Sequence, residues 1–353
     1  MPEPVNLWAY ERLAEERLDA GAFGYFAGGS SDEWTLRENV AAFNRWVLRP
    51  RVLVDVGSVT TRTTVLGADV SMPILVAPTA FNRLAHPEGE AALARAAAAA
   101  DTVFCLSTLA SVSPAELAAA APEARRWFQL YWARDRGFTG ELVVAAAEAG
   151  FEAIVLTVDL PAGGRRERDL RAAFEVPTEL PLPNLPRPLR GELQAALSEM
   201  VDPTITWRDL DWLASLSDLP LVVKGILTAE DARLACRHGA AAIVVSNHGG
   251  RQLDGVPASL DALPEVVEEC AGEVTVLLDG GVRRGGDVLK AIALGARAVL
   301  VGRAPLWGLA VGGEEGARHV LELLRAELAL ALTLLGCPSP GAVTPAHIAR
   351  RQR

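Results

Sequence analysis

The sequence contains only four cysteines, and they form no CxxC motif. Cys105, Cys236, Cys270 and Cys337 are widely spaced along the 353 residues. Their spacing matches neither a zinc site nor a disulfide framework, so we interpret them as reduced core residues in a reducing compartment. The five histidines form no HExxH motif and no cluster with cysteine, and the sequence therefore predicts no metal site.

Long hydrophobic runs are also absent. The longest ones, such as residues 96–100 and 326–335, are shorter than the roughly 20 apolar residues that cross a membrane. The chain opens without a basic segment followed by an apolar one, which is the pattern of a secretory leader. We therefore expect a cytoplasmic protein with no membrane partner.

Positive charge is in deficit. The chain has 34 Lys and Arg against 44 Asp and Glu, a net charge of −10. A general nucleic-acid binder needs an excess of cations to neutralise phosphates, so this class is excluded, whereas a local basic pocket for a small anion is not. Half of the residues are apolar and 22% are charged, which is typical of a globular protein.

What the sequence does contain is a regular alternation of short apolar strands and helical segments. Eight continuous apolar strands separated by helices match a (β/α)8 barrel better than a doubly wound sheet. The predicted strands are Ile74–Ala77, Val103–Leu106, Trp127–Leu130, Ala153–Thr157, Leu221–Val223, Ala242–Ser246, Val274–Leu278 and Ala298–Val301. The predicted helices between them are Glu88–Ala100, Pro114–Ala120, Thr139–Ala149, Trp207–Ser215, Ala229–His238, Leu260–Cys270 and Gly286–Leu294.

These elements predict an α/β fold, a TIM barrel over about residues 73–335 within a single domain of residues 1–353. Residues 1–45 have a helical pattern, residues 46–72 contain short β-like pieces, and Glu314–Leu335 forms a final helix. The longest interval follows the fourth strand and contains five prolines between Pro177 and Pro188. This insertion, about residues 175–205, cannot be a regular helix or a central strand, and either a mobile lid or a plain surface excursion fits its composition.

The stretch from Ile243 to Gly255 joins the sixth strand to a polar loop with several glycines. Arg251, three residues after His248, supplies a cation beside a proton acceptor, which suits an anionic substrate that must lose a proton. A polar turn after a core strand would have a similar sequence. The other strand ends decide between the two, because all of them meet at one pocket in such a barrel. Nearly every one has a hydrogen-bonding residue, including Thr79, Ser107, Gln129, Tyr131, Thr157, Asp159, Lys224, Ser246, Asp279, Arg283 and Arg303.

Two loops predict a phosphate site. Gly280-Gly281 with Arg283 follows the seventh strand and Gly302-Arg303 follows the eighth, where barrels of this kind bind phosphate through backbone amides and a cation. Lys224, at the end of a buried strand, must face a counter-charge. Either a ring that becomes anionic on reduction or a salt bridge to Asp279 would provide it.

The motifs together resemble the FMN-dependent α-hydroxy-acid oxidases and dehydrogenases, a family that includes glycolate oxidase, lactate oxidase and mandelate dehydrogenase. The likeness covers nearly the whole chain. The residues that carry it are Ser246–Gln252, Pro78–Ala80, His86–Glu90, Phe128–Tyr131, Leu156–Asp159, Arg165–Glu167, Val223–Gly225 and Leu278–Gly285.

The resemblance implies a role for each site residue. His248 would be the base, paired with Asp159, and Tyr131 would bond the substrate hydroxyl. Arg251, Arg166 and Tyr25 would bind the substrate carboxylate. Lys224 would stabilise reduced FMN. Further FMN contacts would come from Thr79, Ala80, Ser107, Gln129, Thr157, Ser246, Asp279, Gly281, Arg283, Gly302 and Arg303.

Two positions depart from the glycolate-oxidase pattern. Leu109 stands where that subgroup has a tryptophan near the substrate side chain, and Phe81 stands where it has a methionine. The smaller Leu109 should leave room for a substrate longer than glycolate, either aliphatic or aryl.

The predicted function is oxidation of an (S)-2-hydroxy acid to the 2-oxo acid with O2 reduced to H2O2. The first alternative is the same half-reaction with electrons passed to a quinone or a protein. Another phosphate-binding barrel, similar to IMP dehydrogenase, would need a loop cysteine, whereas Cys105 lies before the end of its strand. A flavin-binding protein without turnover would lack the catalytic set. The resemblance also implies a homo-oligomer, a tetramer or an octamer.

Overall fold

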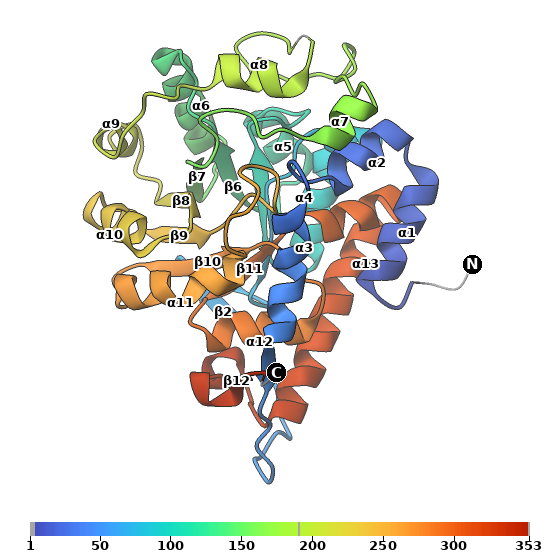
Figure 1. Ribbon diagram of the computed structural model, residues 1–353, viewed down its shortest axis with the longest axis vertical. Coiled ribbons are helices and arrows are strands. Elements are labelled where there is room, and N and C mark those ends of the chain that lie inside the picture. The colour runs from blue at the N-terminus through green and yellow to red at the C-terminus, as the bar shows by residue number, and fades with distance from the viewer. Residues whose placement is uncertain (1–3, 190, 352–353) are drawn as a thin grey trace.

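The centre of the molecule is a closed barrel of eight parallel strands (Figure 1). The structure is a computed structural model that describes residues 4–189 and 191–351. The strands follow one another around the barrel in chain order, and β11 pairs with β4 to close it. Their bounds are β4 (Ile74–Val76), β5 (Val103–Ser107), β6 (Arg125–Leu130), β7 (Ala153–Thr157), β8 (Leu221–Ile226), β9 (Ala242–Val245), β10 (Thr275–Asp279) and β11 (Ala298–Val301). The predicted TIM barrel is confirmed.

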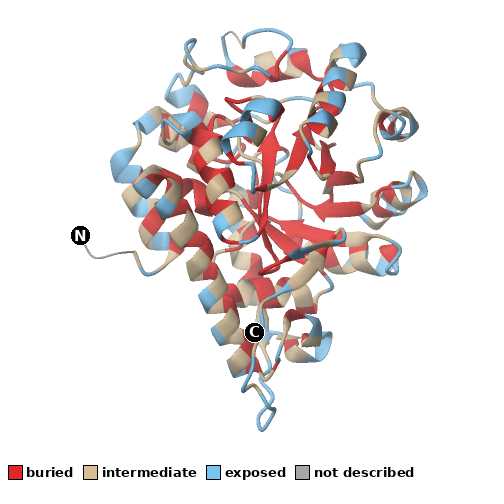
Figure 2. Cartoon of the chain, turned by 180° about the vertical axis from the view of Figure 1, so that it is seen from behind, coloured by how far each residue is buried: buried red, intermediate tan, exposed pale blue. Residues whose placement is uncertain are grey.

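Helices surround the strands, which are buried at the centre (Figure 2). Local capping explains where several begin: α5 starts with a capping box between Ser113 and Glu116, and Asp135 and Thr228 cap α6 and α10. The bounds are α4 (Gly89–Ala99), α5 (Pro114–Ala120), α6 (Arg136–Glu148), α9 (Asp209–Ala214), α10 (Ala229–Arg237), α11 (Ser259–Cys270) and α12 (Gly285–Ala293).

Each strand divides its side chains between two apolar cores. Alternate residues point to opposite faces of a strand, so Val103 and Cys105 of β5 pack inside the barrel whereas Phe104 and Leu106 pack against the helices. The same alternation separates residues of the other strands. It also fixes which side chains enter the barrel when a strand reaches its carboxyl end.

The segments before and after the barrel pack against its outer helices, and their short strands pair with each other. The chain begins with the helices α1 (Leu7–Arg17), α2 (Ala20–Ala27) and α3 (Trp34–Ala41), and α1 packs along α13 (Figure 1). Strand β1 (Trp46–Leu48) pairs with β12 (Ile348–Arg350), and β2 (Thr63–Val65) pairs with β3 (Ala68–Val70). Short 3-10 helices are η1 (Ala42–Arg45), η2 (Asn82–Leu84), η3 (Pro340–Ala342) and η4 (Pro345–His347).

The insertion after β7 is partly helical, which corrects the sequence prediction. Helix α7 (Glu167–Arg171) precedes the prolines, and α8 (Leu193–Met200) follows them. The prediction holds for Pro177–Pro188, where no helix or strand forms. It fails for α8 because that part of the insertion has no proline and presents the buried Leu193, Leu197 and Met200 at helical spacing.

The predicted final helix, Glu314–Leu335, is preceded by a helical segment that the sequence did not predict. Helix α13 spans Arg303–Leu335, with non-helical backbone at Gly312 and Gly313. The two glycines break the apolar periodicity, so the sequence revealed only the second part. At this break the chain turns back on itself, since the Gly308 and Gly316 backbones lie in direct contact. No helix in residues 4–189 and 191–351 is long and apolar enough to span a membrane, and these residues contain no cluster suited to a metal ion.

The contact at the α13 break predicts that replacing Gly308 by alanine lowers the stability much more than replacing Gly312 does. A Cβ at residue 308 would lie 2.4 Å from the Gly316 carbonyl oxygen, whereas a Cβ at residue 312 would meet nothing within 4 Å. We expect Gly308→Ala to lower the free energy of unfolding by about 1–3 kcal/mol, as overpacking does. Gly312→Ala is the matched control and should stay near the parent value. Urea unfolding of both variants measures the difference, and equal stability would contradict the described contact.

Candidate active site

One cavity lies at the carboxyl ends of the barrel strands. It encloses about 1080 Å³, including its open mouth. Seventeen of the nineteen predicted site residues line it, namely Tyr25, Thr79, Ala80, Ser107, Leu109, Gln129, Tyr131, Thr157, Arg166, Lys224, His248, Arg251, Asp279, Gly281, Arg283, Gly302 and Arg303. The other two, Asp159 and Ser246, lie directly behind this wall, where they bond to His248 and Lys224.

The strand alternation explains why these residues converge. In β5 the inward series Val103, Cys105 continues to Ser107. In β7 the inward series Ala153, Val155 continues to Thr157. Both strands therefore change from apolar to polar side chains at their carboxyl ends, on the face that points into the barrel. The apolar interior of the barrel ends in a layer of polar side chains, and this layer lines the bottom of the cavity.

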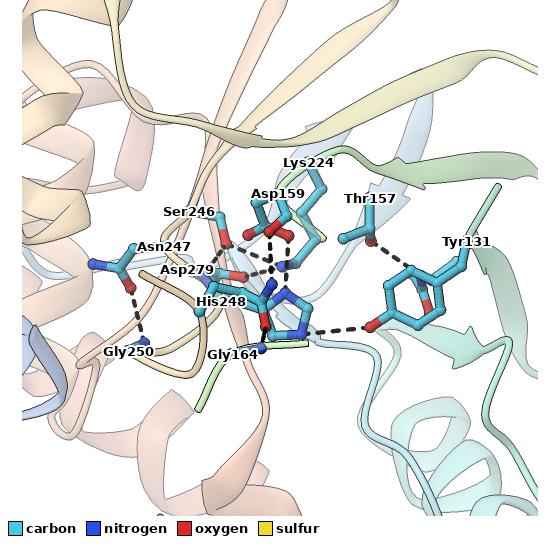
Figure 3. Close-up of polar contacts among 12 residues, drawn as sticks. Tyr131, Thr157, Asp159, Gly164, Lys224, Ser246, Asn247, His248, Gly250 and Asp279 are labelled. Carbon is cyan, nitrogen blue, oxygen red and sulfur yellow. Dashed lines mark hydrogen bonds and ion pairs between the residues drawn. The ribbon is translucent and has the colours of Figure 1, made fainter. Parts of the chain in front are cut away.

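His248 and Asp159 form the central pair of the site (Figure 3). The His248 Nδ1 lies 2.9 Å from the Asp159 Oδ1, and its Nε2 lies 3.4 Å from the Tyr131 hydroxyl. Burial lowers the pKa of His248, and the carboxylate of Asp159 opposes this effect. Burial alone would raise the pKa of Asp159, but His248 and Lys224 together lower it. The pair is thus a neutral imidazole held by an ionised carboxylate, with its other nitrogen available in the cavity.

A bulge in β8 makes room for this pair. Gly225 has a φ of +117°, and the register of β8 against β9 shifts between Lys224 and Ile226. A Cβ at residue 225 would lie 2.8 Å from the Cβ of Asp159. Only glycine, which has no Cβ, can adopt this φ and also pack this closely against the Asp159 side chain. Gly225 therefore sets how closely Asp159 lies to the barrel wall.

Lys224 forms the salt bridge that the sequence left as an alternative. Its Nζ lies 3.2 Å from the Asp279 Oδ2 and 3.0 Å from the Ser246 Oγ (Figure 3). Burial would lower the pKa of Lys224, but Asp279 and Asp159 raise it above its usual value. The lysine is therefore charged, and it lines the cavity as well. The other oxygen of Asp279, Oδ1, is buried without a partner.

Four arginines share the same cavity with Lys224. Burial and the neighbouring Arg166 lower the pKa of Arg251 to about 10, and burial with Arg251 and Arg283 lowers that of Arg303 to about 9. The Nε and Nη1 of Arg166 are buried and have no partner. Asp279 is the one carboxylate among the lining residues. The cavity thus has an excess of positive charge although the whole chain has a net charge of −10, and it fits ligands with at least two anionic groups.

A chain of hydrogen bonds joins the polar residues at the carboxyl ends of β5, β6 and β7. The Ser107 hydroxyl donates to the Gln129 Oε1 at 3.1 Å, and the Gln129 Nε2 donates to the Thr157 Oγ1 at 3.0 Å. The Thr108 hydroxyl donates to the Gln129 carbonyl and accepts from the Tyr131 N–H. Ordered donors and acceptors of this kind suit the polar edge of a flat heterocycle.

Several residues at the site were not predicted from the sequence. Leu197 of α8 lines the cavity from the insertion, far from any strand end. Asn39 exchanges two hydrogen bonds of 2.8 Å with Asn247 and so fixes the loop that holds His248. Gln252 donates to the Asp159 carbonyl from the other side. No local motif marks Asn39 or Leu197, because each acts through a long-range contact.

Comparison with known proteins identifies the family. The model of the FMN-dependent dehydrogenases matches residues 14–350. The chain belongs to the FMN-dependent dehydrogenase family. It is 52% identical to an L-lactate oxidase of Nostoc sp. over 95% of both chains, and 48% identical to glycolate oxidase 3 of Arabidopsis thaliana over 98% of this chain and 96% of the relative.

Solved structures give the same result. The crystal structure of a mandelate oxidase with (S)-4-hydroxymandelic acid superimposes with a TM-score of 0.93 at 44% identity, covering 99% of both chains. FMN is therefore the cofactor, and the protein is an oxidase of 2-hydroxy acids. The alternative in which a quinone or a protein takes the electrons is set aside, since oxidases use O2.

The cavity fits FMN on its own features. A dianionic phosphate and a carboxylate substrate would neutralise the excess of cations. The backbone at Gly280 and Gly281 has positive φ, and Arg283 and Arg303 both line the cavity, where the charge of Arg283 lowers the pKa of Arg303. The wall with Gln129 and Thr157 offers polar contacts to a flat ring, and Lys224 offers a positive charge beside it.

Arg283 gives a direct test of the phosphate end. It packs over the Trp8 ring, and burial lowers its pKa, which favours an anionic partner. Hydrogen bonds to charged groups contribute about 1.5–3 kcal/mol, so Arg283→Gln should weaken FMN binding about 10- to 150-fold. The measurement is flavin retained after gel filtration and the Kd from flavin fluorescence. Arg318→Gln, at an exposed arginine paired with Glu315, is the control. If both variants retained the same amount of flavin, Arg283 would not be a ligand of the phosphate.

Proposed function

We propose that His248 is the base in the oxidation of an (S)-2-hydroxy acid to the 2-oxo acid, with O2 reduced to H2O2. The observation that carries this proposal is the buried His248–Asp159 pair, which leaves the His248 Nε2 facing the cavity beside Tyr131. A base must be neutral at working pH and must reach the proton that it removes. The lowered pKa of His248 supports the first requirement, and its place on the cavity wall supports the second.

The substrate carboxylate binds to Arg166 and Arg251 in this proposal. The unpartnered nitrogens of Arg166 are buried at the cavity, and a carboxylate would satisfy them. Arg251 is oriented by the carbonyls of Tyr25 and Gly28, to which its Nη1 donates, and it lies 4.8 Å above the Tyr25 ring. Two fixed cations that hold the carboxylate leave the bound substrate little freedom to rotate. Fixing the orientation of the α-carbon in this way lowers the activation barrier of the reaction.

The proton then passes to the His248 Nε2. It comes from the α-carbon, or from the substrate hydroxyl if hydride leaves the α-carbon, and the same base serves both routes. Asp159 stabilises the imidazolium that forms. Burial and the nearby charge of Asp159 raise the pKa of Tyr131, so its hydroxyl stays protonated and donates to the substrate oxygen. FMN, when bound, would supply the acceptor for the two electrons and the redox chemistry that reduces O2.

Further residues hold the cofactor. We assign Lys224 to the electron-rich edge of the ring, and Thr79, Ala80, Ser107, Gln129, Thr157 and Ser246 to the ring and ribityl chain. The phosphate end contains Asp279, Gly281, Arg283, Gly302 and Arg303. Support comes from their shared cavity and from the salt bridge that keeps Lys224 charged.

Leu109 and Leu197 bound the space for the substrate's side chain. Leu109 follows β5 and Leu197 comes from α8, and both line the cavity. Phe81 lies further back, where its ring packs 5.6 Å from that of Tyr25. We propose that this apolar end accepts an aliphatic or aryl side chain larger than that of glycolate. The insertion is then a wall of the substrate site.

We also propose a single-domain chain that self-associates in a reducing, cytoplasmic environment. One apolar core extends from Leu7 to Ile348, which supports a single domain. Val52 and Leu53 are almost fully exposed in one loop, and Leu330 and Leu334 are exposed on α13. The Arg51 N–H donates to the Leu335 carbonyl, which places the loop beside the end of α13, and exposed apolar side chains at neighbouring segments favour a contact between copies. All four cysteines are free.

Replacing His248 tests the base. In His248→Gln the imidazole is absent, and anaerobic bleaching of the flavin by L-lactate should slow by about 10²–10⁴-fold while the protein stays yellow. In the parent enzyme, protonation of His248 removes its lone pair, so kcat/KM should fall with acid. Because burial lowers the pKa, this fall should lie below pH 6.5.

The control for this test is His347→Gln, which changes a partly exposed histidine near the carboxyl end of the chain that is bonded to Thr344. It should leave both the bleaching rate and the pH profile unchanged. A His248→Gln enzyme that is reduced at the parent rate would contradict the proposal, as would an acid limb above pH 6.5.

Enlarging Leu109 tests the side-chain space. Leu109→Trp fills the apolar end of the cavity, so the ratio of kcat/KM for (S)-mandelate to that for glycolate should fall. Features of methylene size change selectivity by about 1–3 kcal/mol, or roughly 10- to 200-fold. Val144→Trp, on the exposed face of α6, is the matched control. An unchanged ratio in Leu109→Trp would place the substrate side chain elsewhere.

A further inference from the structure

Cys236 and Cys270 lie side by side outside the active-site cavity. Cys236 is in the last turn of α10 and Cys270 is the last residue of α11, and their sulfur atoms are 3.8 Å apart. These two helices are neighbours on the outer face of the barrel (Figure 1). The other two cysteines have no such neighbour: Cys105 is inside the barrel, and the Cys337 sulfur contacts the Ala342 carbonyl.

A salt bridge keeps the two helices in register near the thiols. Arg233, one turn before Cys236, donates its Nε and Nη2 to the two carboxylate oxygens of Glu269, the residue before Cys270. A bidentate pair of this kind restrains both the distance and the orientation of its partners. The thiols are therefore held close together, and the sulfurs must approach further to reach the length of a disulfide bond.

Both sulfurs are also within reach of a small oxidant. Cys236 is partly exposed on the protein surface. Cys270 is buried from bulk solvent, but it lines a second open cavity of about 1280 Å³ together with Gly272, Thr275 and Arg297. This cavity lies at the amino end of the barrel strands, away from the FMN site.

We propose that Cys236 and Cys270 are an oxidisable dithiol that H2O2, the product of this enzyme, converts into a disulfide. The Cys236 thiol loses its proton and its sulfur attacks peroxide. An S–O bond forms as the O–O bond breaks, and the hydroxide that leaves takes up that proton to give one water. The Cys270 sulfur then attacks that of Cys236, the S–S bond forms as the S–O bond breaks, and a second water takes the Cys270 proton. Two thiols supply the two electrons that reduce one peroxide.

The environments of the two thiols set this order. Burial and the neighbouring Cys236 raise the pKa of Cys270 to about 12, so Cys270 stays protonated and reacts second. Cys236 is the more exposed of the two and meets peroxide first. The chain between them contains β9 and the loop with His248 and Arg251. The disulfide would therefore join the two ends of the segment that carries the base, without touching the substrate.

The test counts thiols in the holoenzyme before and after oxidation. Added H2O2 should lower the thiols measured under denaturing conditions from four to two, and mass spectrometry should find one peptide pair linking Cys236 to Cys270, two hydrogens lighter. Turnover of L-lactate in air should give the same link, and catalase should prevent it. Added peroxide works without substrate, so this arm stands even if the proposed catalytic roles are wrong.

Single variants separate the pair from general oxidation. Cys270→Ser should trap a sulfenic acid on Cys236 that dimedone labels, and Cys236→Ser should leave Cys270 unlabelled. Four remaining thiols after peroxide treatment would overturn the proposal, and so would equal thiol loss in the parent and in Cys236→Ser. A link formed by added peroxide but not during turnover would overturn the part of the proposal that makes the enzyme's own product the oxidant.

Discussion

The organisation of this protein depends on a group of buried cations that repel one another. Arg166, Arg251, Arg283, Arg303 and Lys224 line one cavity, and their repulsion, together with burial, lowers the pKa of Arg251 and Arg303. Burying unpaired charge is costly, so the fold must provide local acceptors as well as anionic ligands. Asp279 pairs with Lys224, and backbone carbonyls serve the arginines. In the proposed function, a phosphate and a carboxylate neutralise the remaining excess of positive charge.

This requirement explains the position of the amino-terminal helices. Arg251 donates to the carbonyls of Tyr25 and Gly28, and Arg303 donates to those of Phe26, Gly28 and Gly249. The end of α2 is thus held against the barrel by two arginines of the cavity, which we propose as anion ligands. The Tyr25 ring also stacks on that of Phe174, in the segment after β7, with 4.9 Å between the ring centroids. The end of α2 therefore contacts this segment as well as the barrel. The amino-terminal segment is therefore part of the site as well as a cover for the barrel.

The sequence predicted the barrel and most of the cavity because both follow from local pattern. Apolar runs of strand length gave the eight strands, and the residue after each run gave a place at the carboxyl end. Leu197 and Asn39 could not be predicted, since their roles depend on contacts between segments far apart in the chain. The part of α13 after the break at Gly312 and Gly313 was predicted, whereas the part before it was missed because the two glycines interrupt the apolar periodicity. The roles of individual residues came from family resemblance, as geometry alone does not name a flavin.

The two halves of the substrate site are constrained to different degrees. Asn39, Gln252 and the bulge at Gly225 hold the loop with His248 and its partner Asp159, so a change there alters the geometry of the base. The apolar end is bounded by Leu109 and Leu197, whose aliphatic side chains have no hydrogen-bonding groups. Relatives named for lactate, glycolate and mandelate share this fold. A rigid polar half and a replaceable apolar half allow one chemistry to serve side chains of different size, because volume at Leu109 can change without disturbing the base.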